Sequence, residues 1–231
     1  MGAKHLYQTK NGTHLAGFFA MVCLYSLVMN NLSELFTIAD RETKAGHNKA
    51  AIQAYQQILQ QSEAGSQAQH LAHWGIGDIY LNDKQYDKAE LHLKKAIELK
   101  SDEPIYHYLL GCTYRYINNV EGALYHLQKA LDLDPSREQF WGELGWVVGH
   151  NQDAAKGIEY LKKSLAINPT NPNSLRDICM LYAKSRKWSE AQVCIEEAEK
   201  QDPDSPLIRK LKKDVAFFRS EFERLSGKPT P

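Results

Sequence analysis

Residues 138–171 of this 231-residue chain read EQFWGELGWVVGHNQDAAKGIEYLKKSLAINPTN, and neighbouring stretches repeat their plan. A small residue at Gly145 belongs to a series with a period of 34, whose other members are Gly77, Gly111 and Cys179. A second small series runs in step with it, at Ala89, Ala123, Gly157 and Ala191. Helix backbones approach closely only where side chains are small, so these series indicate a stack of helical hairpins.

Larger residues and prolines keep the same phase. Bulky or ring-bearing side chains stand four positions before the first series, at His73, His107, Trp141 and Leu175. Proline closes three of the units, at Pro135, Pro169 and Pro203. Because proline cannot continue a helix, each of these marks a turn to the next hairpin. Other prolines fall where a new helix would begin, a position that tolerates the missing N–H, at Pro104, Pro172 and Pro206.

This pattern resembles the tetratricopeptide repeat (TPR), a 34-residue unit with an aromatic residue, Leu-Gly, Tyr, Ala and Pro at fixed places. The match includes Leu110, Gly111 and Tyr114 in one unit and Trp141 and Gly145 in another. The resemblance implies an all-α fold, an α-solenoid of about five TPR hairpins. We expect the array at residues 32–205, with units at 32–69, 70–103, 104–137, 138–171 and 172–205.

The end of the chain, residues 206–231, is expected to form a capping helix and tail. Its apolar residues alternate steps of three and four, at Ile208, Leu211, Val215, Phe218, Phe222 and Leu225. One stripe of this kind would cover the last hairpin. Self-association through an overhanging part of the helix is the alternative, since about three heptads are enough for a coiled coil.

The beginning of the chain, residues 1–31, is expected to form an apolar helix, either a half-repeat or a membrane anchor. Residues 15–29 are uncharged and mostly apolar, but the run is shorter than the roughly 20 residues that cross a bilayer. Asn30 and Asn31 make a poor cleavage site for a secretory signal. The phase of Gly12 and Gly17 fits a half-repeat, whose outer apolar face would need a second copy, a partner helix or a membrane to cover it.

Composition is that of a soluble domain, with 24% charged and 43% hydrophobic residues and no formal net charge. We therefore expect no nucleic-acid partner. The cysteines show no paired spacing, at Cys23, Cys112, Cys179 and Cys194. Such usage favours a reducing compartment, hence a cytoplasmic protein, with membrane anchoring through the N-terminal segment as the alternative.

No motif for reaction chemistry emerges, so we expect a protein that is not an enzyme and has no catalytic residues, metal or cofactor. The histidines His73 and His107 share one repeat position, which explains their recurrence without a metal site. Gly75 and Gly77 lack the third glycine and the preceding strand of a dinucleotide loop.

A binding surface is what the resemblance implies instead, because the first helix of each TPR hairpin lines a concave groove that holds a peptide or helix. Aromatic rings supply contact area at low entropic cost, and arginine adds directional pairing. The peptide-binding residues that we expect on this basis are Trp74, Asp78, Tyr108, Arg115, Tyr116, Trp146 and Arg176.

One TPR subtype binds the terminal carboxylate of heat-shock chaperones through Lys, Asn and Arg. The matching positions here hold other residues, namely Phe36, Asp40, Gly75, Ile105 and Leu109. The partner should therefore present apolar or aromatic side chains and charges of both signs. We expect a scaffold or adaptor for protein–protein interaction, with a membrane-tethered assembly factor anchored through residues 15–29 as the alternative.

Overall fold

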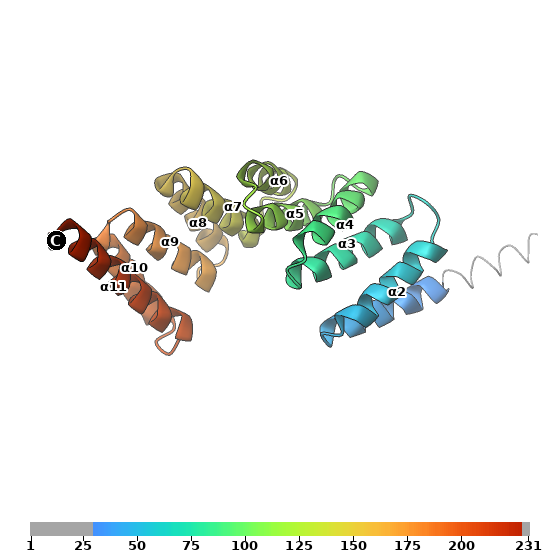
Figure 1. The fold of residues 1–231 in the computed structure, drawn as a ribbon, viewed down its shortest axis with the longest axis horizontal. Coiled ribbons are helices and arrows are strands. Elements are labelled where there is room, and N and C mark those ends of the chain that lie inside the picture. The colour runs from blue at the N-terminus through green and yellow to red at the C-terminus, as the bar shows by residue number, and fades with distance from the viewer. Residues whose placement is uncertain (1–29, 228–231) are drawn as a thin grey trace, which may run out of the picture. The chain divides into compact units, whose positions relative to one another are not determined.

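The computed structural model describes residues 30–227, which form helices joined by short turns and contain no strand (Figure 1). The expected all-α architecture of helical hairpins is thereby confirmed. The chain divides into two compact units, Met1–Ser101 and Asp102–Pro231. The apolar helix expected at residues 1–31 lies almost entirely outside the described residues. Within residues 30–227, no helix combines the length and apolar character that a membrane crossing requires.

The N-terminal unit begins with a helix at residues 30–44. Three further helices follow it, α2 (Asn48–Gln61), α3 (Gln67–Asn82) and α4 (Tyr86–Leu99). Helix α3 packs against both α2 and α4. The core between the first helices is formed by Leu32, Leu35, Ala39, Ala51, Ala54, Tyr55, Ile58, Ala72, Ile76 and Ile79.

The C-terminal unit contains three hairpins and one further helix. The hairpins are α5 (Pro104–Tyr116) with α6 (Val120–Leu133), α7 (Glu138–Asn151) with α8 (Ala154–Ile167), and α9 (Pro172–Lys184) with α10 (Trp188–Gln201). The further helix, α11 (Pro206–Ser226), packs against α9 and α10. Helix α5 contacts α7, α7 contacts α9, and α9 contacts α11, so these four helices form one continuous wall of the unit.

Close helix packing explains the first small series. A Cβ atom on Gly111 would lie 2.7 Å from Leu127 Cγ, and one on Gly145 would lie 2.8 Å from Leu161 Cγ. Real Cβ atoms essentially never approach so closely, so any larger residue would push the two helices of the hairpin apart.

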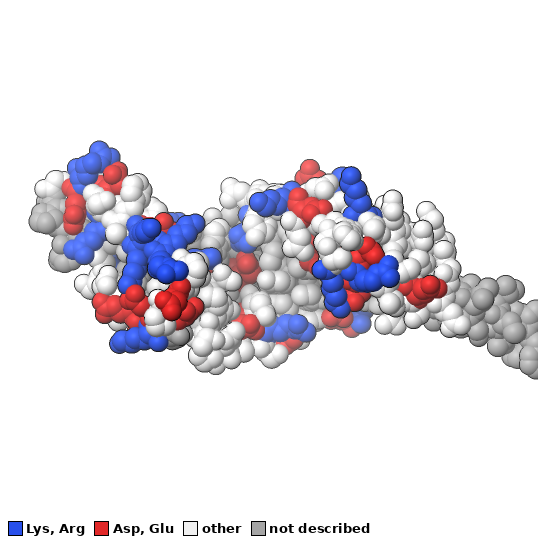
Figure 2. Space-filling model, turned by 90° about the horizontal axis from the view of Figure 1, so that it is seen from below, with Lys and Arg blue, Asp and Glu red and all other residues white. Residues whose placement is uncertain are grey.

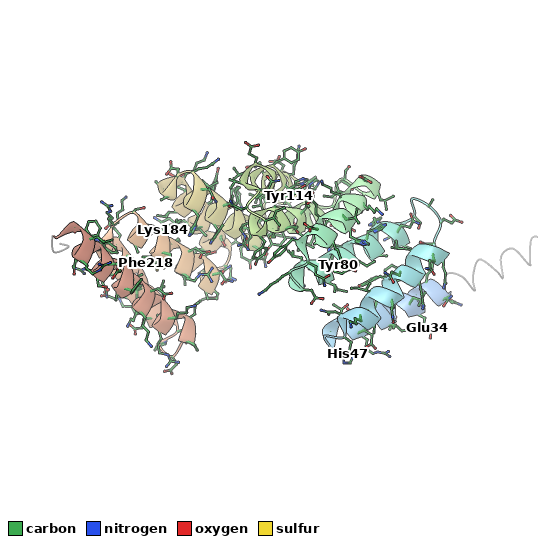
Figure 3. All side chains as sticks on the ribbon, viewed as in Figure 1. Glu34, His47, Tyr80, Tyr114, Lys184 and Phe218 are labelled. Atoms are coloured by element: carbon green, nitrogen blue, oxygen red, sulfur yellow. A yellow bond between two sulfur atoms is a disulfide. The ribbon has the colours of Figure 1, made fainter. Side chains whose placement is uncertain are left out.

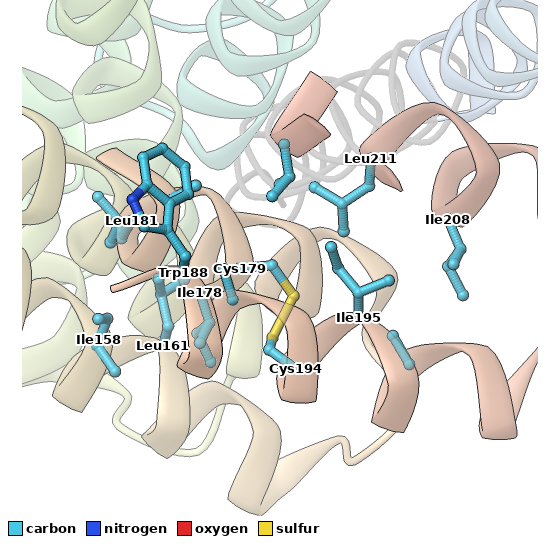
Figure 4. Close-up of a cluster of buried hydrophobic side chains, with 14 residues drawn as sticks. Ile158, Leu161, Ile178, Cys179, Leu181, Trp188, Cys194, Ile195, Ile208 and Leu211 are labelled. Atoms are coloured by element: carbon cyan, nitrogen blue, oxygen red, sulfur yellow. A yellow bond between two sulfur atoms is a disulfide. The ribbon is translucent and has the colours of Figure 1, made fainter. Parts of the chain in front are cut away.

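The fourth position of that series, Cys179, is joined to Cys194 by a disulfide between α9 and α10, with the Cα atoms 5.6 Å apart (Figure 4). The lack of a paired spacing among the cysteines therefore gave no sign of this disulfide. A separation of 15 residues is no known disulfide motif, but a helical hairpin folds these two positions onto each other. Cys112 is free and buried.

Helix α11 divides the expected apolar stripe into two parts. Ile208, Leu211 and Val215 are buried against the last hairpin (Figure 4). Farther along the helix, Phe218 is 41% exposed and Leu225 74% exposed; Figure 3 labels Phe218 on this helix. The first part therefore caps the hairpin. In the second part Phe222 still packs on Trp188 of α10, with ring centroids 6.1 Å apart, whereas Phe218 and Leu225 leave apolar surface exposed.

Candidate functional site

The candidate site is a groove on the wall formed by α5, α7, α9 and α11. Two adjoining pockets of about 330 Å³ and 320 Å³ make up this groove. The first lies over α5, α7 and α9, and the second over α7, α9 and α11. Trp146, Arg176 and Asp177 line both, so the pockets are continuous.

The repeat itself sets which side chains line the groove. Helices α7, α9 and α11 each contribute residues at spacings of three, one and three, which lie on one face of an α-helix. On α7 these are Gln139, Gly142, Glu143 and Trp146; on α9 they are Asn173, Arg176, Asp177 and Met180; on α11 they are Leu207, Lys210, Leu211 and Asp214. Each set lies 34 residues after the previous one. Helix α11 therefore serves as the first helix of a further repeat, in addition to capping the hairpin.

A stack of four planar groups stands at the centre of the groove, and we call it the arginine stack: Tyr116, Arg115, Trp146 and His150. The guanidinium of Arg115 lies 4.0 Å from the ring centroid of Tyr116 and 4.8 Å from that of Trp146. The imidazole of His150 stacks on Trp146 at 4.4 Å with 15° between the planes. Cation–π contacts with these two rings hold the Arg115 head group in place.

Glu143 completes the hold on Arg115, with 2.7 Å between Oε2 and the arginine Nε. Burial raises the pKa of the Glu143 carboxyl, and the charge of Arg115 opposes that rise. Burial, the largest single influence, would lower the pKa of the Arg115 guanidinium, but Glu143, Tyr116 and Cys112 together outweigh it and raise that pKa. The pair therefore links α5 to α7 through a charge contact that is largely shielded from water.

Arg176 and Asp177 form the corresponding charge contact on α9. Nε and Nη2 of Arg176 donate to Asp177 Oδ1 at 2.9 Å and 2.7 Å. Nη1 donates to Asn173 Oδ1 at 3.3 Å. The side chain of Arg176 is 37% exposed and that of Asp177 only 10%, so the groove presents the cation and hides the carboxylate.

The structure brings five of the seven expected peptide-binding residues into one pocket. Tyr108, Arg115, Tyr116, Trp146 and Arg176 all line the first pocket. Tyr108 also stacks on buried Phe140, with ring centroids 4.8 Å apart. Whether these residues contact a peptide stays a prediction.

The other two expected residues, Trp74 and Asp78, lie on α3 in the N-terminal unit. Trp74 is partly buried, and burial raises the pKa of the Asp78 carboxyl, which accepts a hydrogen bond from Asn82 Nδ2 at 3.5 Å. They belong to a separate part of the molecule from the pocket-lining five.

Sequence reasoning missed the contribution of α11 to the groove. Leu207, Lys210, Leu211 and Asp214 line the second pocket. The available signal was their spacing of 34 from residues on α9, beginning with Pro206 after Pro172. The apolar stripe of α11 predicts only the face that packs against the last hairpin.

Histidines in two repeats pair across their hairpins. Nδ1 of His73 lies 3.0 Å from Nδ1 of His92, and the same distance separates Nδ1 of His107 from Nδ1 of His126. In each pair one ring nitrogen donates and the other accepts. Residues 30–227 contain no cluster of three or more His, Cys, Asp or Glu side chains that could hold a metal ion.

Comparison with solved structures shows the same fold. MamA is 23% identical over 72% of this chain and 95% of its own, with a TM-score of 0.64. YrrB, described as "a TPR protein with an unusual peptide-binding site", is 18% identical over 78% of this chain and 90% of its own, with a TM-score of 0.63. A tetratricopeptide repeat protein from Parabacteroides merdae is 13% identical over 87% of this chain and 81% of its own, with a TM-score of 0.72.

Comparison with protein families identifies the repeats directly. No curated protein sequence matches the chain significantly. Three family profiles described as tetratricopeptide repeat match residues 36–104, 104–137 and 150–215. Together they cover well over half of the sequence and most positions of the small and bulky series. The chain belongs to the tetratricopeptide repeat family.

Proposed function

We propose that this protein is a non-catalytic interaction scaffold that binds a peptide or helix in the groove formed by α5, α7, α9 and α11. The arginine stack is the observation that carries this proposal. Trp, Tyr and Arg are the residues most enriched at the energetic centres of protein interfaces, and here all three are held in fixed positions beside open pockets. A preorganised surface loses little side-chain entropy on binding.

The charges in the groove support binding rather than catalysis. Glu143 and Asp177 each contact an arginine, which fixes the shape of the groove. The described peptide-binding site of YrrB, a protein with the same fold, is in accord with a peptide partner.

Trp146→Ala tests the proposal, because Trp146 lines both pockets. Trp141→Ala is a matched control on the same helix: its indole N–H donates to the Pro135 carbonyl at 2.8 Å, and its ring lines neither pocket. Partners captured from the native source should be lost with Trp146→Ala and kept with Trp141→Ala, while circular dichroism shows both variants folded. If both variants captured partners equally well, the groove would not be the binding surface.

A parallel Trp74→Ala variant tests the expected contribution of α3. We expect weaker capture with a nearly unchanged melting temperature. Full capture by this variant, together with loss in Trp146→Ala, would restrict binding to the C-terminal unit.

The alternative proposal, a membrane-tethered assembly factor, rests on residues 15–29, which lie outside the described residues. It predicts that the intact chain sediments with membranes and that removal of residues 1–31 releases it. Intact, monodisperse protein obtained without detergent would contradict tethering and leave the scaffold proposal standing.

A further inference from the structure

The second pocket carries two cations at equivalent repeat positions, Arg176 on α9 and Lys210 on α11. Lys210 is exposed and makes no ion pair within the described part of the chain. Nη1 and Nη2 of Arg176 each carry two N–H groups, of which one already donates, to Asn173 and to Asp177 respectively. These two side chains therefore offer hydrogen-bond donors to whatever enters the pocket.

Apolar side chains form the rest of the same pocket. Trp146, Met180, Leu207 and Leu211 line it. The indole of Trp146 is held between Arg115 and His150, while the thioether of Met180 can adapt to different shapes. A volume of about 320 Å³ is at the lower end of the range for ligand pockets, about 300 to 1,000 Å³. It offers room for one large side chain and its neighbours in a peptide.

We propose that this pocket binds an acidic side chain that stands beside a large apolar side chain in a partner peptide. The carboxylate accepts hydrogen bonds from Arg176 and Lys210, and the apolar side chain packs against Leu207 and the edge of the Trp146 indole, which is stacked between Arg115 and His150. This inference rests on the proposed peptide-binding function and names the chemistry of the partner. The sequence predicts a partner with charges of both signs; this inference specifies that the charge bound in the second pocket is negative.

The burial of the groove's own acids favours an acidic partner over a basic one. Asp177 is 10% exposed and already hydrogen-bonded to Arg176, and Glu143 forms an ion pair with Arg115. Asp214 is the remaining carboxylate of the second pocket, and it is partly exposed on α11. A basic side chain in this pocket would face the cations Arg176 and Lys210, with Asp214 as the one lining carboxylate outside a described ion pair.

The test begins with a phage library of random short peptides selected on the full-length protein. Enriched peptides are synthesised with a fluorescent label and measured by anisotropy. We expect enrichment of sequences that join Asp or Glu to large apolar residues. Arg176→Gln and Lys210→Gln should each weaken binding about tenfold, the loss of one charge-assisted hydrogen bond. Arg209→Gln is the matched control. This substitution removes the same charge one residue earlier on α11, and Arg209 lines neither pocket.

The outcomes separate this inference from the proposed function. Peptides that require Trp146 but carry no acidic residue would overturn the inference and keep the binding function. Failure of every enriched peptide to depend on Trp146 would overturn both. Equal weakening by Lys210→Gln and Arg209→Gln would show a nonspecific charge effect and would also overturn the inference.

Asp214→Asn gives a test of sign. Removing this carboxylate should tighten binding of an acidic peptide several-fold, because it removes a repulsive neighbour of the bound carboxylate. Weaker binding by Asp214→Asn would mean that the pocket takes a cation, against the inference.

Discussion

The same repeat position holds Trp74 on α3 of the N-terminal unit and Gly142 on α7 of the C-terminal unit. Near Trp74, the ring of Tyr55 covers α3 so closely that a Cβ on Gly75 would lie 2.7 Å from Tyr55 Cε2. Around Gly142 the surface opens into a pocket of about 330 Å³. Two units with the same helical hairpins thus present a filled face and a hollow one, so the side chains at the groove positions decide where a partner can bind.

The largest expected effect comes from giving α7 the tryptophan that α3 carries at the same repeat position. Gly142→Trp places the bulk of Trp74 on α7 and should abolish detectable binding of any peptide that depends on Trp146. Gly142→Ala is the control, since its Cβ would lie 3.3 Å from Ser174 Oγ, a contact that a small shift relieves. Alanine should keep binding, and it raises helix stability by up to about 1 kcal/mol. Retained binding in Gly142→Trp would mean that the pocket is not the binding surface.

The second largest effect is expected from the disulfide, which joins two helices of the C-terminal unit. Replacing Cys179 and Cys194 together by alanine should destabilise the C-terminal unit by about 3 kcal/mol, the value for a closed loop of roughly 15 residues. Hydrogen exchange resolved by helix should show faster opening in α9 and α10 and no change in α3 and α4. Cys112→Ala is the control for losing a buried sulfur. Detection of Cys179 and Cys194 as free thiols in protein purified without reductant would contradict the disulfide.

A smaller loss is expected at the charge pair of the C-terminal unit. Arg115→Leu should lower the free energy of unfolding by about 2 kcal/mol, because the largely buried Glu143 carboxylate loses its partner. Adding Glu143→Leu should recover most of that loss, since no charge then stays unpaired. Denaturant titration of the three variants measures both steps. An unaffected single variant would show that water reaches the pair freely.

The smallest expected effect is a loss of stability of the N-terminal unit at acidic pH. Burial lowers the pKa of His92 to about 4, and burial also lowers that of His73. A histidine whose folded pKa is lowered stabilises the fold above its unfolded pKa, near 6.5, and this contribution falls as the pH drops toward 4. We expect the N-terminal unit to lose about 1 kcal/mol between pH 7.5 and pH 5, a value reduced for partial exposure. His92→Gln should lose less over that range; a parallel loss in both proteins would exclude this pair as the cause.

The helical frame could be predicted well from the sequence, because the close contacts between helices require small residues at regular intervals. Gly111 and Gly145 are small since Leu127 and Leu161 press on them, and such contacts recur with the repeat. The aromatic and arginine residues of the groove followed from the same phase. The opening at Gly142 could not be predicted in this way, because a pocket depends on a missing side chain. The disulfide of Cys179 joins residues with no recognisable spacing.

The arginine stack has a practical consequence for optical measurements. Of the four tryptophans of the chain, Trp146 is the one that lines the two groove pockets, and a cation and an imidazole flank it. A peptide that settles on this ring would displace water from it and alter its fluorescence emission. The protein therefore carries an intrinsic reporter of occupancy, which a variant with the other indoles replaced by phenylalanine would isolate.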